Sequence, residues 1–133
     1  MEKEKKEFCT VITCMDGRIQ LPVIAYLQNR FDAEYVDSIT EPGPNLIFSK
    51  QTDIHLVESI LSRLKISVEK HKSAGVAVVG HYDCAGNPAK KDDQIKHIEE
   101  SIRFIQQKYK ELEIIGLWAD ENWEVQELEG LAE

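Results

Sequence analysis

Residues 75–80 read GVAVVG, and the chain continues from them directly as HYDC at residues 81–84. The run is apolar throughout, carries three valines and has glycine at both ends. This composition predicts a strand that is buried on both faces. Strands of that kind lie in parallel sheets covered by helices on each side, so the segment predicts an α/β fold.

The segments on either side of residues 75–80 alternate between strand-like and helix-like patterns. Runs rich in β-branched and apolar residues predict three more strands, at 8–13, 35–40 and 113–119. Apolar residues at helical spacing predict three helices, at about 19–30, 50–71 and 92–109. The first of these helices is expected to bury the side that carries Leu21, Ile24, Ala25 and Leu27.

This alternation predicts a parallel sheet with right-handed crossovers and helices on both faces. We expect a single domain over residues 1–133, with a mostly parallel four-stranded sheet in the order 2-1-3-4. Residues 120–122 form the expected turn, and residues 123–128 return as a short antiparallel edge strand. Residues 41–45 (EPGPN) are predicted to be a loop, because two prolines and a glycine disfavour regular structure.

The composition narrows the classes of function. The net charge of −8 disfavours a nucleic-acid partner, because phosphate binding needs clustered Lys and Arg. No apolar run approaches the roughly 20 residues that span a bilayer, so we expect no membrane partner. Residues 1–7 are charged and lack the apolar core of a signal peptide, which predicts a cytoplasmic protein.

Two of the predicted strands end at residues that can bind a metal. Cys14 follows the first strand, and His81 follows the third, with Cys84 three positions further on. In a sheet of order 2-1-3-4, ligands bind at the carboxyl ends of the first and third strands. Two thiolates and one imidazole suit Zn²⁺ and leave its fourth position open, as in catalytic zinc sites. The alternative is that both cysteines are buried thiols of the core.

Asp16 and Arg18 stand close to Cys14 in the sequence. Arg18 offers a bidentate partner that would hold the Asp16 carboxylate away from the metal. Water could then occupy the fourth position, where zinc lowers its pKa from about 15.7 to about 7 and yields hydroxide. If Arg18 releases Asp16, the carboxylate becomes a fourth ligand and closes the site.

The segments CMDGR at 14–18 and GHYDC at 80–84 resemble the C-x-D-x-R and H-x-x-C signatures of β-class carbonic anhydrases. The resemblance extends from about residue 8 to residue 128, and the chain is similar to a short, divergent member of that family. It implies a zinc lyase that hydrates carbon dioxide reversibly to bicarbonate by zinc-bound hydroxide. It also implies a homodimer or a higher homo-oligomer.

The resemblance assigns roles to individual residues. The implied zinc ligands are Cys14, His81 and Cys84, and the implied catalytic pair is Asp16 and Arg18. Asp16 is also the implied fourth ligand of a closed state.

The loop after the second strand departs from the family pattern. Thr40-Glu41-Pro42-Gly43 stands where the family has Arg-Asn-Ala-Gly. Gly43 is retained, and we expect its backbone to approach the substrate pocket closely. Glu41 is expected to bring an acidic charge to the mouth of the site.

This departure leaves two other functions open. Related folds with the same zinc site hydrolyse carbonyl sulfide or carbon disulfide, so the substrate can be another small linear molecule. A non-catalytic zinc-binding regulatory domain is the third possibility, with Asp16 remaining on the metal. A redox role for the cysteines is disfavoured, because the chain has no C-x-x-C motif.

Other chemically notable residues are interpreted as structural. Cys9 lies inside the first predicted strand and is assigned to the core. Asp83 is interpreted as a cap for the following turn. Trp118 and Trp123 are expected to pack around the closing hairpin.

Overall fold

Strand β3 (Val76–His81) lies in the middle of the sheet, and every one of its residues is buried. The computed structural model describes residues 6–130. The other strands are β1 (Phe8–Cys14), β2 (Tyr35–Glu41), β4 (Ile114–Ala119) and β5 (Val125–Leu128). Their order is β2-β1-β3-β4-β5, with β5 antiparallel to β4 and all other pairs parallel. The predicted order and the antiparallel edge strand are confirmed.

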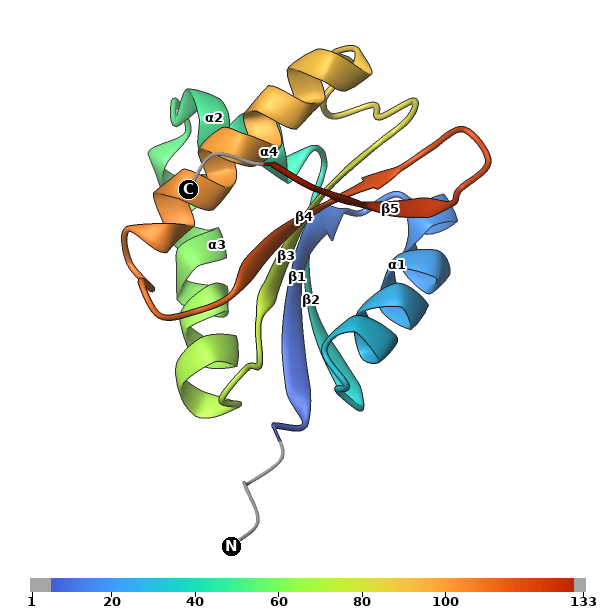
Figure 1. Cartoon of the computed structure of the whole chain (residues 1–133). Helices are drawn as coiled ribbons and strands as arrows, with labels where there is room; N and C mark the ends of the chain where they lie inside the picture. Colours follow the sequence, from blue (N-terminus) through green and yellow to red (C-terminus); the bar gives the residue numbers. More distant parts are fainter. Residues whose placement is uncertain (1–5, 131–133) are drawn as a thin grey trace, which may run out of the picture.

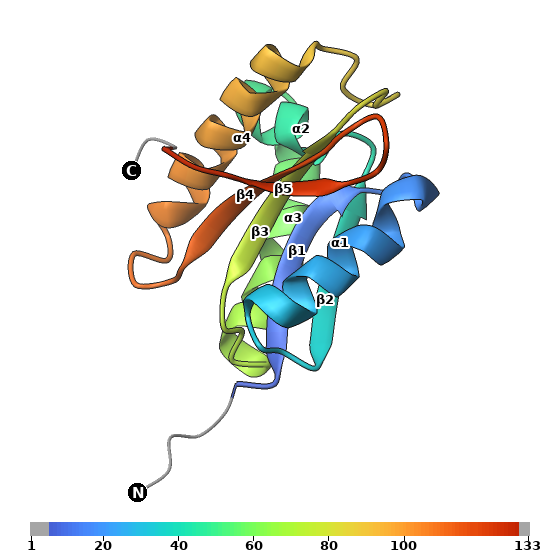
Figure 2. The same cartoon turned by 45° about the vertical axis from the view of Figure 1, so that its right-hand side comes forward.

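The helices cover both faces of this sheet (Figures 1 and 2). Helix α1 (Gly17–Arg30) packs on one face, where its buried residues join those of β1, β3 and β4. Three helices pack on the other face: α2 (Pro44–Lys50), α3 (Ile54–Lys65) and α4 (Lys91–Gln106). The predicted α/β architecture with two covered faces is therefore confirmed.

Of the four residues predicted for the buried side of helix α1, Leu27 is buried. The buried residues of the helix are Ile19, Val23 and Leu27, whereas Leu21 is 80% exposed and Ala25 is exposed as well. Both sets recur at helical spacing, so periodicity alone does not choose between them. Asp16 caps the helix by accepting a hydrogen bond from the backbone N–H of Arg18, and Ile19, Val23 and Leu27 pack with the core residues of the sheet.

The predicted helix at 50–71 begins later and ends differently. Helix α2 stops at Lys50, because Gln51 takes a left-handed conformation with a φ of 52°. Asp53 then caps α3 by accepting a hydrogen bond of 3.1 Å from the N–H of Leu56. Residues Ile66–Lys70 continue α3 as a single π-helical turn.

The predicted loop at 41–45 is shorter than expected. Glu41 is the last residue of β2, and Pro44 begins α2. Proline is well suited to the first position of a helix, where its missing N–H has no helical partner to lose. Only residues 42 and 43 remain as the connection.

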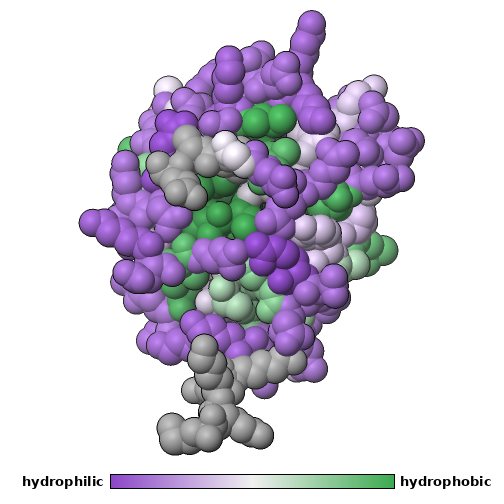
Figure 3. All heavy atoms as spheres, in the orientation of Figure 1, coloured by the Kyte–Doolittle hydropathy of each residue, from purple (hydrophilic) through white to green (hydrophobic). Residues whose placement is uncertain are grey.

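The face of the molecule seen in Figure 1 is hydrophilic around its rim and apolar in its centre (Figure 3). A pocket of about 530 Å³ opens between α4 and β5, and Ile102, Leu112 and Leu128 belong to its lining. Among residues 6–130, no helix combines the length and the apolar character that crossing a membrane requires.

Candidate metal centre

Three potential metal ligands meet at one edge of the sheet. Cys14 is the last residue of β1, His81 is the last residue of β3, and Cys84 lies in the turn that follows. Their ligand atoms all lie within 4.8 Å of one another, and the two sulfur atoms are 3.8 Å apart. All three side chains are buried. The parallel pairing of β1 with β3 brings these segments together, because both strands end at the same edge.

The imidazole of His81 presents one nitrogen to the two sulfur atoms. Its Nδ1 lies 2.8 Å from the carbonyl oxygen of Tyr82, so Nδ1 carries the proton and donates this bond. In the neutral ring, Nε2 then holds a lone pair. Nε2 is buried and has no hydrogen-bond partner. A buried polar atom left in this way is costly, by about 1–3 kcal/mol, unless a ligand satisfies it.

The backbone of His81 is held by a buried glutamine. The Oε1 atom of Gln94 accepts a hydrogen bond of 3.3 Å from the N–H of His81, and its Nε2 donates one of 3.0 Å to the carbonyl oxygen of His81. A second donation from Nε2 reaches the carbonyl oxygen of Ala89. The amide of Gln94 therefore fixes the end of β3 where the imidazole begins.

Backbone N–H groups approach both sulfur atoms. Cys14 accepts hydrogen bonds from the backbone of Asp16 and Gly43, and Cys84 accepts them from Gly86 and Asn87. Donors aimed at sulfur stabilise the thiolate, which is the form that binds metals.

The two thiols differ in acidity. The hydrogen bond from Cys84, together with the nearby imidazole of His81, outweighs burial and lowers the pKa of Cys14. The same bond between the sulfurs, with burial, raises the pKa of Cys84. Burial opposes protonation of His81, but the neighbouring Cys14 sulfur and the carbonyl oxygen of Tyr82 outweigh burial and raise its pKa. These contacts favour the thiolate form at Cys14.

These donors fit a zinc ion. Two sulfur atoms and one imidazole nitrogen form a borderline-soft set, and three protein ligands leave one tetrahedral position open. The partnerless Nε2 of His81 is the atom that such an ion would satisfy. Among residues 6–130, Asp16 does not belong to this cluster of potential ligands.

Arg18 holds the Asp16 carboxylate. The guanidinium donates from Nε to Oδ1 at 3.0 Å and from Nη2 to Oδ2 at 2.7 Å. The backbone N–H of Arg18 donates to Oδ1 at 2.9 Å as well. These bonds to Arg18 lower the pKa of Asp16 to about 2. Asp16 is therefore ionised, and it lies against Arg18 rather than among the potential metal ligands.

Arg18 has two further partners that the sequence reasoning missed. Asp83 accepts a hydrogen bond of 3.3 Å from Nη1 at its carboxylate and one of 3.1 Å from Nη2 at its carbonyl oxygen. Trp123 lies against the guanidinium, with the ring centroid 4.4 Å from Cζ. The predicted strand order could have indicated both contacts. The turns that follow the neighbouring strands β3 and β4 must lie at the same edge of the sheet.

Gly43 lies beside the site through its backbone. Its φ is +58°, and a Cβ at this position would be 2.6 Å from the backbone carbon of Gly86. A Cβ on Gly86 would in turn be 2.4 Å from the backbone carbon of Pro42. The two glycines therefore let two loops cross in direct contact. Whether Gly43 also lines the substrate pocket stays a prediction.

Glu41 does not bring a free acidic charge to the site. Its carboxylate forms an ion pair with Arg63 of α3, and its side chain is 18% exposed. Successive residues of a strand point to opposite faces, so Glu41 shares the α3 face with buried Ile39. The acidic charge of Glu41 is therefore paired with Arg63, and whether it lies at the mouth of the site stays a prediction.

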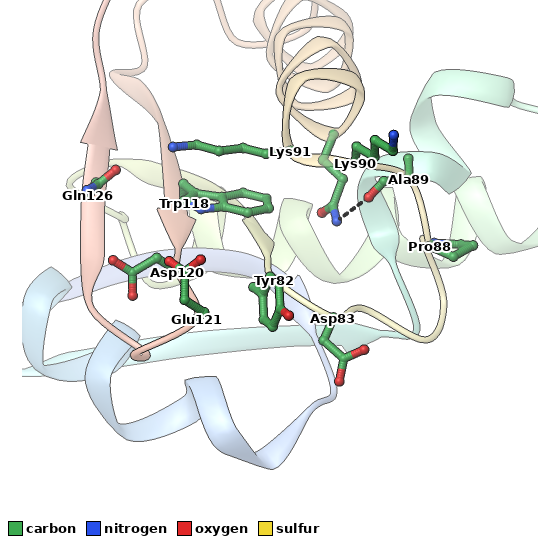
Figure 4. Close-up of a pocket in the computed structure, with 11 residues that line it drawn as sticks. Tyr82, Asp83, Pro88, Ala89, Lys90, Lys91, Trp118, Asp120, Glu121 and Gln126 are labelled. Atoms are coloured by element: carbon green, nitrogen blue, oxygen red, sulfur yellow. Dashed lines mark hydrogen bonds between the residues drawn. The ribbon is translucent and has the colours of Figure 1, made fainter.

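A pocket of about 560 Å³ adjoins the turn between His81 and Cys84. Tyr82, Asp83 and Trp118 belong to its lining, whereas the three potential ligands do not. Lys91 extends over the Trp118 ring, with Nζ 5.7 Å from the centroid, and Asp83 points away from that ring (Figure 4). Trp118 thus packs beside the closing hairpin, as predicted, and it is buried.

Comparisons with known proteins found a matching family model and similar solved structures. A family model described as "putative carbonic anhydrase" matches residues 4–129. A tetrameric β-carbonic anhydrase of Sordaria macrospora is similar in structure, with a TM-score of 0.56, 15% sequence identity, and coverage of 96% of this chain and 82% of that one. The β-carbonic anhydrase CafA of Aspergillus fumigatus gives a TM-score of 0.57 at 15% identity, covering 98% of this chain and 78% of its own.

A third similar structure is the β-carbonic anhydrase CcaA, with a TM-score of 0.59 at 13% identity. The match covers 94% of this chain and 81% of CcaA. A comparison with curated proteins found no match. At these identities the solved structures establish a shared fold.

Proposed function

The chain belongs to the carbonic anhydrase family whose model it matches, and we propose that it hydrates carbon dioxide reversibly to bicarbonate. In this proposal Cys14, His81 and Cys84 hold one zinc ion. Asp16 and Arg18 are the catalytic pair beside the ion, and carbon dioxide is the substrate.

The Nε2 atom of His81 carries this proposal. It is buried, it has no hydrogen-bond partner, and it faces two cysteine sulfurs whose own surroundings supply N–H donors. Without a metal, an apolar residue in the same space would be more stabilising than His81, because it would leave no polar atom unsatisfied. The alternative of two ordinary buried thiols leaves this nitrogen unexplained.

Bound zinc would supply a Lewis acid that lowers the pKa of water at its open position. Asp16 is ionised and can accept a hydrogen bond from a polar group beside the metal, which orients that group toward carbon dioxide. Arg18 keeps both carboxylate oxygens of Asp16 engaged, so that the carboxylate does not take the open position itself. The pair thereby orients the reacting group and keeps the Asp16 carboxylate out of the open metal position.

A homo-oligomer is part of the same proposal. The similar structure from Sordaria macrospora is described as tetrameric. Met15, Leu21 and Tyr82 are large apolar or aromatic side chains that are more than half exposed, and Met15 and Tyr82 directly follow β1 and β3. Burial of such side chains against a partner would remove apolar surface from water. A cytoplasmic location and a single domain over residues 1–133 stay predictions from the sequence.

Stopped-flow measurement of carbon dioxide hydration tests the proposal, on protein that carries one zinc per chain. We expect activity that rises with pH between 6.5 and 9 and that is lost in Asp16→Ala and in Cys84→Ser. Cys9→Ala is the matched control, because Cys9 is buried in the core away from the cluster.

Two results would contradict the proposal. Full zinc occupancy without hydration at any pH would exclude carbon dioxide as the substrate. Parallel assays with carbonyl sulfide and carbon disulfide then separate a different small substrate from a zinc-stabilised domain without activity. Protein purified without chelators that retains no zinc would contradict the metal site itself.

A further inference from the structure

We propose that Asp83 and Trp123 are positioning residues that keep Arg18 on Asp16, and so keep the open metal position free of the Asp16 carboxylate. This inference rests on the function proposed above for Asp16. The contacts themselves can nevertheless be tested on the protein without metal.

Arg18 cannot be fixed by Asp16 alone. The two residues are separated by one position at the start of α1, so they can move together with that end of the helix. Asp83 and Trp123 come from elsewhere in the fold: the turn after β3 and the turn between β4 and β5. Only groups of this kind can tie the guanidinium to the rest of the sheet edge.

The contacts divide the guanidinium between them. Asp16 takes Nε and Nη2 in a bidentate pair, and Asp83 takes Nη1 and also Nη2 through its carbonyl oxygen. Trp123 covers the flat face at 4.4 Å, which is the geometry of a cation–π contact. The edges and one face of the group are therefore held by three different segments.

The backbone at both positioning residues is held in an uncommon conformation. Asp83 has a φ of +57° and Trp123 has a φ of +60°. For a residue as bulky as tryptophan this conformation is a genuine outlier, and it persists only where the surrounding structure imposes it. Because two such residues contact the same guanidinium, we infer that the fold positions both of them specifically against Arg18.

Specific hydrogen bonds impose that conformation. The Asp120 carboxylate accepts the N–H groups of Asn122 and Glu124 at 2.9 and 3.0 Å, and the N–H of Trp123 donates to the carbonyl oxygen of Asp120. The N–H of Tyr82 donates to the carbonyl oxygen of Ala119, which joins the turn after β3 to the end of β4. The turns that carry Asp83 and Trp123 are therefore linked, and together they face Arg18.

Loss of this support changes what Asp16 can reach. If the guanidinium leaves, the carboxylate loses two of its hydrogen bonds and keeps the one from the backbone N–H of Arg18. It then stands two residues from Cys14 as a free anionic ligand. Asp83 and Trp123 thus set how often the carboxylate is free to close the metal site.

Proton exchange at the Nε–H of Arg18 measures this directly in metal-free protein, by ¹⁵N NMR. Exchange requires the Nε–H to leave Asp16, so its rate follows the opening equilibrium. We expect Trp123→Leu to accelerate exchange by about two- to fivefold, the effect of losing one exposed cation–π contact. Asp83→Asn should also accelerate it, whereas Trp123→Phe, which keeps an aromatic face, should restore a rate near that of the unsubstituted protein.

Arg30 supplies the control in the same spectrum, because its Nε–H donates to Glu127 at 2.8 Å, away from the metal cluster. Its exchange should not change in any of these variants. Unchanged exchange at Arg18 in Trp123→Leu would overturn the proposal. Equal acceleration at Arg18 and Arg30 would overturn it too, because the substitution would then loosen the whole fold.

A second measurement uses cobalt(II)-loaded protein, with azide as a probe of the open position. Trp123→Leu should weaken azide binding, because Asp16 then competes for the metal. Adding Asp16→Asn should restore it, and a weakening that persists in the double variant would overturn the proposal. Failure of azide to bind the unsubstituted cobalt protein would instead contradict the proposed function. The exchange measurement on metal-free protein would still test the contacts of Arg18 independently.

Discussion

The crossing of Gly43 over Gly86 makes Gly43→Ala the most informative substitution in this protein. A Cβ at residue 43 would lie 2.6, 2.7 and 2.8 Å from three backbone atoms of Gly86 and Asn87. Backbone atoms cannot move aside as the end of a flexible side chain can. The two loops must therefore separate, and with them the N–H donors that face Cys14 and Cys84.

The magnitude follows from two costs. A residue other than glycine at a φ of +58° loses roughly 1–2 kcal/mol. Overpacking against fixed backbone costs about 1–3 kcal/mol more. We therefore expect Gly43→Ala to lower the free energy of unfolding by about 2–5 kcal/mol. Gly86→Ala meets similar crowding, but Gly86 has no positive φ, so about 1–3 kcal/mol is expected there.

Urea unfolding of the metal-free variants measures these losses. With a slope of about 1–3 kcal/mol per molar urea, a loss of 3 kcal/mol lowers the midpoint by roughly 1–3 M. Gly17→Ala is the matched control, because a Cβ at residue 17 meets no atom within 4 Å. It should leave stability unchanged or raise it by about 0.4–1 kcal/mol. The double variant Gly43→Ala/Gly86→Ala should cost less than the sum, since one separation of the loops relieves both contacts.

A loss below about 1 kcal/mol in Gly43→Ala would refute this reasoning. It would mean that the two loops do not cross in contact. Additive losses in the double variant would refute the idea of one shared contact.

Three further outcomes are expected. The pKa of Asp16 is lowered to about 2, so the stabilisation from its ion pair is present above the unfolded value near 3.8 and is lost as the pH falls through 2. Acid unfolding of Asp16→Asn should therefore be less steep between pH 4 and 2, with a loss of only about 1 kcal/mol at pH 7, because the pair is partly exposed. Cys84→Ser should lower zinc content per chain at least tenfold, and Cys9→Ala should not, as measured by metal analysis after dialysis. Arg63→Met leaves the Glu41 carboxylate unpaired, and urea unfolding should show a loss of about 1–3 kcal/mol that Arg63→Lys partly restores.

The features that local sequence patterns determine could be predicted from the sequence. The run at 75–80 packs only as a buried strand, and neighbouring parallel strands must end at the same edge. Cys14 and His81 were therefore predicted to meet, and the structure places them together. Asp16 and Arg18 are only two positions apart, so their pairing was also within reach of local reasoning.

Features that depend on tertiary packing were missed. Periodicity offered two apolar stripes on α1, and the rotation of the helix against β1 decided between Leu21 and Val23. Arg18 meets Asp83 across 65 positions of sequence, a contact that no local pattern records. The pairing of Glu41 with Arg63 depends in the same way on which strand face α3 covers.

The separation of Cys14 from Cys84 by 70 positions has a consequence for the kinetics of folding. In a zinc finger all ligands lie in one short segment, so the metal can organise a local fragment. Here the two sulfurs meet only after β1 and β3 have paired, and contacts so distant in sequence form late. A metal that needs all three ligands therefore leaves the folding rate nearly unchanged and slows unfolding instead. The supply of metal would then set how long each molecule stays folded rather than how quickly it folds.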